Sequence, residues 1–332
     1  MKTKLSYLFS VVLLLTMGAC NRSPQGDAKS SGGAKVLRVG HFPNITHAQG
    51  LIASQLSRQG KGWFEERLGP DVKIEWFVYN AGPSAMEAIL ADSIDLTYVG
   101  PNPVLNTYDK TKGEEIRVVA GAANGGAALV VQGDGRISKP EDFKGRAIAT
   151  PQLGNTQDVA CRAWLVKQGY HVTQLGGDVQ VLPTANPDQL ALFQTGKIDG
   201  AWTVEPWVSR LEMEAKGKVF VEQKDDIATV LASSVKALNE KPELVKKFVA
   251  AHIELTEWIN QHPDEAKALV RAALKQLTGR EFPQPLMEHA WPRLKFVSTA
   301  SRQPFDGLVS QAQSVGFLKG AADLGKLVVE MK

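Results

Sequence analysis

Cysteine is almost absent from this chain of 332 residues, which has only Cys20 and Cys161. Two cysteines allow neither a disulfide framework nor a cysteine-rich metal site. The sequence also has no run rich in Lys and Arg, which argues against nucleic acid as a partner. The motifs G-x-S-x-G, H-E-x-x-H, the P-loop and a G-x-G-x-x-G after a strand are all missing. We therefore expect no catalytic residues and no cofactor.

The overall composition is that of an ordinary globular protein. Hydrophobic residues make up 43% of the chain and charged residues 22%. A chain of this length can bury a large core, and it favours two domains over one. The net charge of +3 includes Lys2 and Lys4, which precede an apolar run.

That N-terminal run has the pattern of a secretory signal. The apolar residues 5–17 follow two lysines and are too few for a spanning helix. Residues 15–20, LTMGAC, resemble a bacterial lipobox, in which Cys20 is lipidated and becomes the new N-terminus. Plain secretion with an incidental cysteine is the alternative. The Gly/Ser-rich stretch that follows predicts a flexible tether.

The stretch 147–166 predicts a strand that turns into a helix. Ala147 to Thr150 is a short apolar run, and Gly154 lies in the polar turn after it. Asn155 stands where a helix N-cap belongs, with Asp158 three residues later. Such a turn directs backbone N–H groups and the positive end of the helix dipole at one spot, which favours an anion. An ordinary capped turn is the alternative.

Similar turns recur along the chain. Short βα units predict parallel-rich sheets with helices on both faces, and ligands then bind beyond the carboxyl ends of the strands. Two extended runs separated by Asn124-Gly125-Gly126 predict a crossing between two lobes, and residues 228–233 predict the return crossing. From about residue 242 we expect only helices, over 242–261, 263–277, 285–294 and 304–315.

Four motifs carry a family resemblance. They are GHFPNITHA at 40–48, YVGPNP at 98–103, GNTQD at 154–158 and WTVEPW at 202–207. In this order they resemble the sulfonate/nitrate/taurine group of substrate-binding proteins, which serve bacterial uptake transporters of the ATP-binding-cassette (ABC) type. The resemblance covers nearly the whole mature chain, although His41 stands where many relatives have Tyr. It implies the two-lobed α/β fold of type II periplasmic binding proteins, with two hinge strands and a ligand between the lobes. The expected organisation is a signal peptide at 1–19, a lipidated cysteine and tether at 20–35, lobe 1 at 36–124 and 230–332, and lobe 2 at 125–229.

The resemblance and the turns together predict the binding site. Neutral donors and helix N-termini suit a weakly basic oxyanion such as a sulfonate, without an arginine. The predicted ligand-binding residues are His41, Asn44, Thr46, His47, Gly100, Asn102, Asn124, Gly125, Gly154, Asn155, Thr156, Trp202 and Glu205.

Several of these residues have a second interpretation. His41, His47 and Glu205 could bind a metal, but two histidines six residues apart match no known ligand spacing, and we expect no metal. Either histidine could instead be structural. Trp202, like Trp207, could pack in the core or form an aromatic wall.

Glu205 is an anion in an expected anion site. It would pair with an ammonium group of the ligand or hold a hinge residue, and Arg162 and Arg210 are its candidate partners. Cys161 is expected to be a small buried hydrophobic residue.

The resemblance thus implies a monomeric solute-binding lipoprotein of an ABC importer. It would capture an aliphatic sulfonate or a related organosulfur anion, and its partners would be a permease, its ATPase subunits and the membrane that holds the lipid anchor. We expect it in the cell envelope, at the periplasmic or extracytoplasmic face. Nitrate, a small aromatic acid or a thiamine-precursor pyrimidine are alternative ligands, and a receptor-associated sensor is an alternative role. An enzyme on the same scaffold is a further alternative, which the lipobox disfavours.

Overall fold

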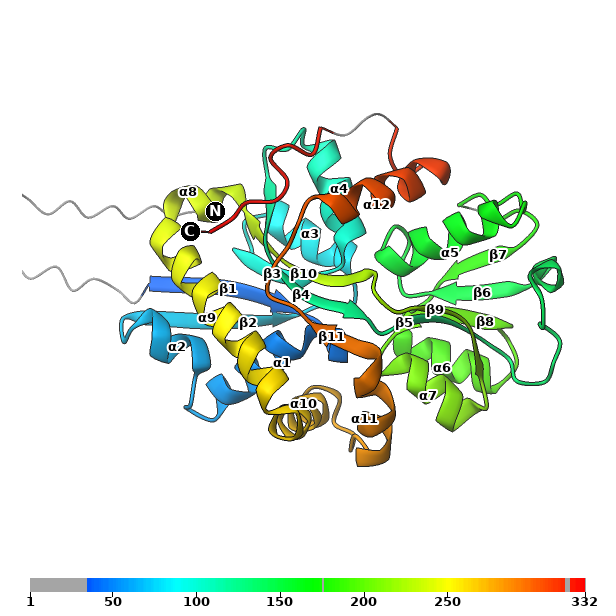
Figure 1. Ribbon diagram of the computed structural model, residues 1–332, viewed down its shortest axis with the longest axis horizontal. Helices are drawn as coiled ribbons and strands as arrows, with labels where there is room; N and C mark the ends of the chain where they lie inside the picture. Colours follow the sequence, from blue (N-terminus) through cyan, green and yellow to red (C-terminus); the bar gives the residue numbers. More distant parts are fainter. Residues whose placement is uncertain (1–34, 175, 320–322, 332) are drawn as a thin grey trace, which may run out of the picture. The chain divides into compact units, whose positions relative to one another are not determined.

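Two β-sheets organise the chain in the computed structural model, which describes residues 35–174, 176–319 and 323–331 (Figure 1). The predictions for the signal peptide and Cys20 lie outside these residues. Both sheets belong to one compact unit.

The first sheet has six strands in the order β11-β4-β10-β3-β1-β2. β1 pairs in parallel with β2 and β3, whereas β10 is antiparallel to both β3 and β4. Short β11 adds an antiparallel edge beside β4. The strands are β1 (Lys35–His41), β2 (Val72–Val78), β3 (Leu96–Val99), β4 (Ile116–Gly125), β10 (Ile227–Ser234) and β11 (Leu294–Phe296).

The second sheet has five strands in the order β7-β6-β8-β5-β9. β6 is parallel to β7 and β8, while β5 is antiparallel to β8 and β9. In both sheets, therefore, the strands of the βα units are parallel, and the strands next to the crossings are antiparallel. The strands are β5 (Ala127–Val131), β6 (Ala147–Thr150), β7 (Gln180–Pro183), β8 (Gly200–Val204) and β9 (Lys218–Gln223).

Helices cover both faces of each sheet. On the first sheet, α1, α2, α9 and α10 lie on one face and α3, α4 and α12 on the other; on the second, α5 lies opposite α6 and α7 (Figure 1). Among the described residues, none of the helices combines the length and apolar character needed to cross a bilayer. The helices are α1 (Ala48–Arg58), α2 (Trp63–Leu68), α3 (Gly82–Leu90), α4 (Pro101–Lys110), α5 (Thr156–Lys167), α6 (Asn186–Gln194), α7 (Trp207–Ala215), α8 (Val235–Glu240), α9 (Pro242–Gln261), α10 (Pro263–Thr278), α11 (Gln284–Ala290) and α12 (Gln303–Ser314).

Aromatic packing fixes the helices on the sheets. Phe64 of α2 and Phe248 of α9 stack with ring centroids 3.9 Å apart beneath the first sheet. In the second sheet region Phe143 packs edge-on against Trp164 of α5. Cys161 of α5 is buried in the same core, as expected of a small hydrophobic residue, and burial raises the pKa of its thiol.

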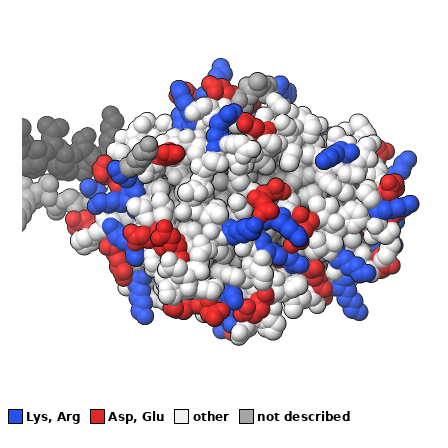
Figure 2. Space-filling model, viewed as in Figure 1, with Lys and Arg blue, Asp and Glu red and all other residues white. Residues whose placement is uncertain are grey.

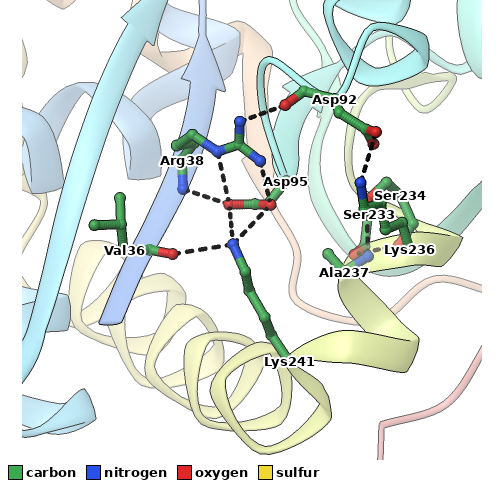
Figure 3. Close-up of polar contacts among 9 residues, drawn as sticks. All are labelled: Val36, Arg38, Asp92, Asp95, Ser233, Ser234, Lys236, Ala237 and Lys241. Carbon is green, nitrogen blue, oxygen red and sulfur yellow. Dashed lines mark hydrogen bonds and ion pairs between the residues drawn. The ribbon is translucent and has the colours of Figure 1, made fainter. Parts of the chain in front are cut away.

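A charged cluster fastens α8 and α9 to the first sheet at the start of β1 (Figure 3). The buried Asp95 carboxylate accepts from Arg38 Nη2 at 2.9 Å and from Lys241 Nζ at 2.9 Å. Burial tends to raise the pKa of Asp95, but these cations outweigh it, so the pKa is lowered. The cluster lies at the amino end of β1, so it is structural and leaves the carboxyl ends of the strands free.

The first crossing between the sheets is short, because β4 ends at Gly125 and β5 begins at Ala127. Gly125 and Gly126 have φ angles of 75° and 70°, in the left-handed region. A Cβ on Gly125 would lie 2.4 Å from the Arg293 carbonyl oxygen. The left-handed backbone conformation therefore favours glycine at both positions. At Gly125 the nearby Arg293 carbonyl also leaves no room for a side chain.

The helix expected over 285–294 is wrong in its second half. α11 ends at Ala290, and a 3-10 turn, Trp291–Arg293, leads into β11. Pro292 has no N–H to continue an α-helical ladder. Leu294 and Phe296 point to one face and are buried, and β11 pairs with β4 across a sequence separation that no local pattern reveals.

Candidate functional site

A small pocket of about 30 Å³ lies between the two sheets. Its polar residues follow the carboxyl ends of β1 and β2 in the first sheet and of β6 and β7 in the second, the place where open α/β sheets bind ligands. The lining residues are Phe42, Asn44, Thr46, His47, Asn80, Ala81, Gly82, Gly100, Pro103, Pro151, Asn155, Thr156, Gln157, Asn186, Val204 and Ala228.

The turn from β6 into α5 is held by its own residues. Asn155 is the N-cap of α5, as predicted, and its Oδ1 accepts from the Asp158 N–H at 2.8 Å. The buried Asp158 carboxylate accepts from the Gly154 N–H at 2.9 Å and from the Thr150 hydroxyl at 2.8 Å. Arg162, only 2% exposed, pairs with the same carboxylate at 3.0 Å. The internal negative charge of this turn is thus already neutralised.

The turn from β1 into α1 is held from the other sheet. Asn44 precedes the short helix Ile45–His47, but its side chain caps no N–H of that helix. Its Oδ1 accepts instead from Trp207 Nε1 at 3.1 Å, and the Ile45 N–H donates to the Glu205 carbonyl at 3.0 Å. Both partners follow β8, so this turn takes its shape from contacts between the sheets.

His47 is the ionisable side chain among the pocket-lining residues. It is 3% exposed, its ring stacks on Phe42 at 4.3 Å, and its Nδ1 has no partner among the described residues. Burial, with a smaller contribution from His41, holds the pKa of His47 well below its usual value. The pocket therefore contains a neutral imidazole at neutral pH, and one nitrogen of that ring has no hydrogen-bond partner among the described residues.

The two sheets approach closely at Gly100 and Thr156. A Cβ on Gly100 would lie 2.3 Å from Thr156 Oγ1, so a side chain there would separate the two sides. The Asn102 N–H, in the first turn of α4, lies 3.4 Å from the same hydroxyl. The N-termini of α4 and α5 therefore meet at the pocket.

The structure divides the predicted ligand-binding residues into two groups. Those that line the pocket are Asn44, Thr46, His47, Gly100, Asn155 and Thr156. Those outside its lining are His41, Asn102, Asn124, Gly125, Gly154, Trp202 and Glu205.

Members of the second group have other surroundings. His41 is fully buried with its ring edge-on to Trp76, and burial lowers its pKa to about 4. Asn102 is buried, and its Nδ2 has no partner among the described residues. Trp202 packs in the core of the second sheet, where its Nε1 donates to Gln223 Oε1 at 2.9 Å.

Three further residues of this group, two glycines and an asparagine, lie beside the pocket. Gly125 forms the crossing, Asn124 faces a separate groove beside α12, and Gly154 lines a groove on the far side of Pro103.

Glu205 pairs with a residue that the sequence did not indicate. Its buried carboxylate accepts from Arg293 Nη1 at 3.0 Å, although the two residues are 88 positions apart. The expected partners are taken elsewhere, because Arg162 pairs with Asp158 and Arg210 with Glu214. Burial raises the pKa of Glu205, and the bonds from Arg293 and Ser209 oppose that rise.

Sequence reasoning missed three polar residues of the lining, Asn80, Gln157 and Asn186. Two of them had a usable signal. Asn80 lies in the turn between β2 and α3, and Asn186 is the first residue of α6 after β7, so both stand at strand-to-helix junctions as Asn44 and Asn155 do. The same rule applied to every strand end would have found both.

Formal charge is absent from the lining. None of the lining residues is Asp, Glu, Lys or Arg. Over the described chain, no group of three or more His, Cys, Asp or Glu is placed to hold a metal ion. Away from the pocket, the face in Figure 2 carries cationic and anionic side chains intermixed.

The sequence is similar to those of known binding proteins. The chain is 26% identical over 276 residues to the putative aliphatic sulfonates-binding protein of Bacillus subtilis (strain 168), covering 81% of this chain and 77% of that protein. It is 28% identical over 204 residues to the taurine-binding periplasmic protein of Escherichia coli (strain K12), covering 58% and 59% respectively.

The fold is also shared with solved structures. The alkanesulfonate-binding protein SsuA from Xanthomonas axonopodis pv. citri, bound to MOPS, superposes with a TM-score of 0.72 at 19% identity. The match covers 90% of this chain and all (100%) of that one. The expected two-lobed fold of type II periplasmic binding proteins is thereby confirmed. The sequence model of the NMT1-like family matches residues 31–274, and the chain belongs to that family.

Proposed function

We propose that this protein is the solute-binding component of an ABC importer and that it holds a small organosulfonate anion in the pocket between the two sheets. The observation that carries the proposal is the lining itself, which is rich in neutral hydrogen-bond donors at helix N-termini. Relatives named for binding aliphatic sulfonates and taurine support the same ligand class.

The chemistry of the lining suits a weakly basic anion. A buried charge is costly unless donors surround it, and backbone N–H groups at helix N-termini supply such donors together with a favourable dipole. Helices α3, α4 and α5 begin at or next to the lining residues Gly82, Gly100 and Thr156. A sulfonate spreads one charge over three oxygens, so several donors can share it without an arginine.

Capture requires the two sheets to move apart and close again. In this proposal the crossings at Gly125–Ala127 and between β9 and β10 act as hinges. The second hinge then lies a few residues before the lobe boundary at 229/230 that the sequence predicts, which falls within β10. Closure would bring Asn44, Thr46 and His47 against Asn155 and Thr156. A ligand should then lower the radius of gyration measured by small-angle scattering.

The remaining parts of the proposal concern location. We place the mature protein at the periplasmic or extracytoplasmic face, as a monomer tethered through lipidated Cys20 and working with a permease and its ATPase subunits. Support comes from the lipobox-like residues 15–20 and from the relative named as a periplasmic protein. Cys20→Ser should abolish fatty-acid labelling and release the protein from the membrane fraction.

The test of ligand class is a thermal-shift and calorimetric panel on the mature domain. It should contain alkanesulfonates, sulfate, nitrate, benzoate and a pyrimidine. A ligand present at a hundred times its Kd should stabilise the fold by about 2.7 kcal/mol. Asn155→Ala with Thr156→Ala should remove that stabilisation, and the exposed pair Asn239→Ala with Lys236→Ala should not.

Two results would contradict the proposal. One is selective binding of nitrate or of the pyrimidine with no response to any sulfonate. The other is recovery of a chemically converted ligand in more than one equivalent per protein, which would make the protein an enzyme.

A further inference from the structure

We infer that the pocket selects anions that carry no ammonium group, so that it binds alkanesulfonates and rejects aminoalkanesulfonates of the same length. This inference rests on the proposed function and narrows its ligand class. It follows from which hydrogen-bonding atoms the lining residues leave free.

Carboxylates near the pocket are already used. Asp158 is paired with Arg162 and accepts from Gly154 and Thr150. Glu205 is paired with Arg293 and accepts from Ser209. Since neither belongs to the lining, an ammonium group in the pocket would meet no opposite charge.

The amide side chains of the lining lead to the same conclusion. Four buried or nearly buried residues, Asn44, Asn155, Gln157 and Asn186, each use the amide oxygen as an acceptor within the protein. The donors to these oxygens are Trp207 Nε1, the Asp158 N–H, Asn155 Nδ2 and the Thr203 hydroxyl, at 3.1, 2.8, 3.3 and 2.9 Å in that order.

The amide nitrogens of these residues make fewer hydrogen bonds within the protein. Those of Asn44, Gln157 and Asn186 have no hydrogen-bond partner among the described residues. These four side chains therefore use their amide oxygens within the fold, and three of them leave amide nitrogens for the ligand. An anion can accept from these donors, whereas an ammonium group would be desolvated with no carboxylate to pair with, at a cost of several kcal/mol.

A matched ligand pair tests this. Propane-1-sulfonate and 3-aminopropane-1-sulfonate share the sulfonate and the three-carbon chain, and they differ in a terminal ammonium group. By calorimetry at pH 7 and fixed salt, the amino compound should bind about a hundredfold more weakly or not at all. Equal affinity for the two would overturn the inference and leave the proposed function standing.

A gain-of-function variant makes the test independent of simple steric exclusion. Asn186→Asp keeps the oxygen that accepts from Thr203 and adds a negative charge to the lining. It should weaken propane-1-sulfonate and strengthen the amino compound, shifting the affinity ratio by about tenfold or more. Gln157→Glu, which keeps its acceptor for Asn155, serves if the first variant does not fold.

The control is Asn239→Asp, an exposed change on α8 with the same change in net charge. It should leave the ratio unaltered. A ratio that Asn186→Asp and Gln157→Glu also leave unaltered would overturn the inference, because selection would then not depend on charge in the lining. If neither sulfonate binds the parent protein, the proposed function fails, and this inference fails with it.

Discussion

Two strand-to-helix turns face each other across the pocket, and they are stabilised in opposite ways. The turn after β6 is held by the N-cap Asn155 and by Asp158, within its own sheet region. The turn after β1 has no side-chain cap and is held by Trp207 and by the Glu205 carbonyl, from the other sheet region. One half of the site is thus preformed, and the other depends on contact between the sheets.

This difference has a consequence for recognition. A preformed turn offers its donors at no ordering cost, so it can make the first contact with a ligand. The turn after β1 reaches the described geometry only when the two sheets are in contact. Its conformation therefore depends on whether the site is open or closed. Variants of the two turns should therefore separate stability from affinity.

The largest effect is expected from Asp158→Ala. Removing this carboxylate leaves the buried Arg162 without its ion pair and releases the Gly154 N–H. Breaking a buried pair costs about 3–5 kcal/mol, measurable as the free energy of unfolding in urea. The exposed pair at the same helical spacing, Arg302 and Asp306, is the control, and Asp306→Ala should cost less than about 1 kcal/mol. Similar losses for both variants would refute the preformed character of this turn.

Acid should destabilise the fold at the turn after β1. Burial lowers the pKa of His41, at the end of β1, to about 4, against an unfolded value near 6.5. Between these values the unfolded chain binds a proton that the folded chain does not. Stability is therefore complete above pH 6.5 and falls with pH, by about 3 kcal/mol at pH 4 from His41 alone.

Measuring the free energy of unfolding from pH 7 to pH 4 checks this. The variant His41→Gln should make that free energy depend less steeply on pH. The exposed His171→Gln, beyond α5, is the matched control. Native-state hydrogen exchange should lose protection in the first sheet before the second. Loss in the opposite order would contradict the assignment of the acid response to this side.

A smaller effect is expected from Asn155→Ala. Loss of the cap bond to Asp158 should cost about 1 kcal/mol of folding stability. Ser234→Ala removes the equivalent bond to the Ala237 N–H at the start of α8, away from the pocket, and should cost a similar amount. Ligand affinity should fall only in the Asn155 variant. An equal fall in both would mean that the cap acts through stability alone.

An effect of similar size, on affinity, is expected from Trp207→Phe, which keeps an aromatic ring and removes the donor to Asn44 across the pocket. A hydrogen bond of this kind contributes about 1 kcal/mol, so affinity should fall about fivefold. Trp202→Phe removes an indole donor that stays within the second sheet region and should leave affinity unchanged. The reverse pattern would show that the first turn does not depend on contact between the sheets.

Local signals predicted the parts of this molecule that depend on nearby residues. The N-cap at Asn155 follows from cap chemistry, and the bounds of α9 follow from the position of Pro242. The fold class could be predicted because βα units succeed one another at short intervals.

Long-range pairing could not be predicted in this way. The bond from Arg293 to Glu205 and the three-residue β11 depend on partners far away in the sequence. Which side of an Asn residue faces the pocket is likewise decided by donors such as Trp207 and Thr203, which reach the amide only in the folded chain.

The position of β10 also sets the order in which the chain can fold during synthesis. β10 lies between β3 and β4, which do not pair with each other, so these two strands cannot join one sheet until residue 234 has left the ribosome. The second sheet uses only residues 127–223, which are continuous in sequence. It can therefore form first, while β3 and β4 wait with open edges that can pair with other chains. If the protein is exported, as the proposed function requires, a holding chaperone has the most exposed surface to bind in the interval before β10 is synthesised.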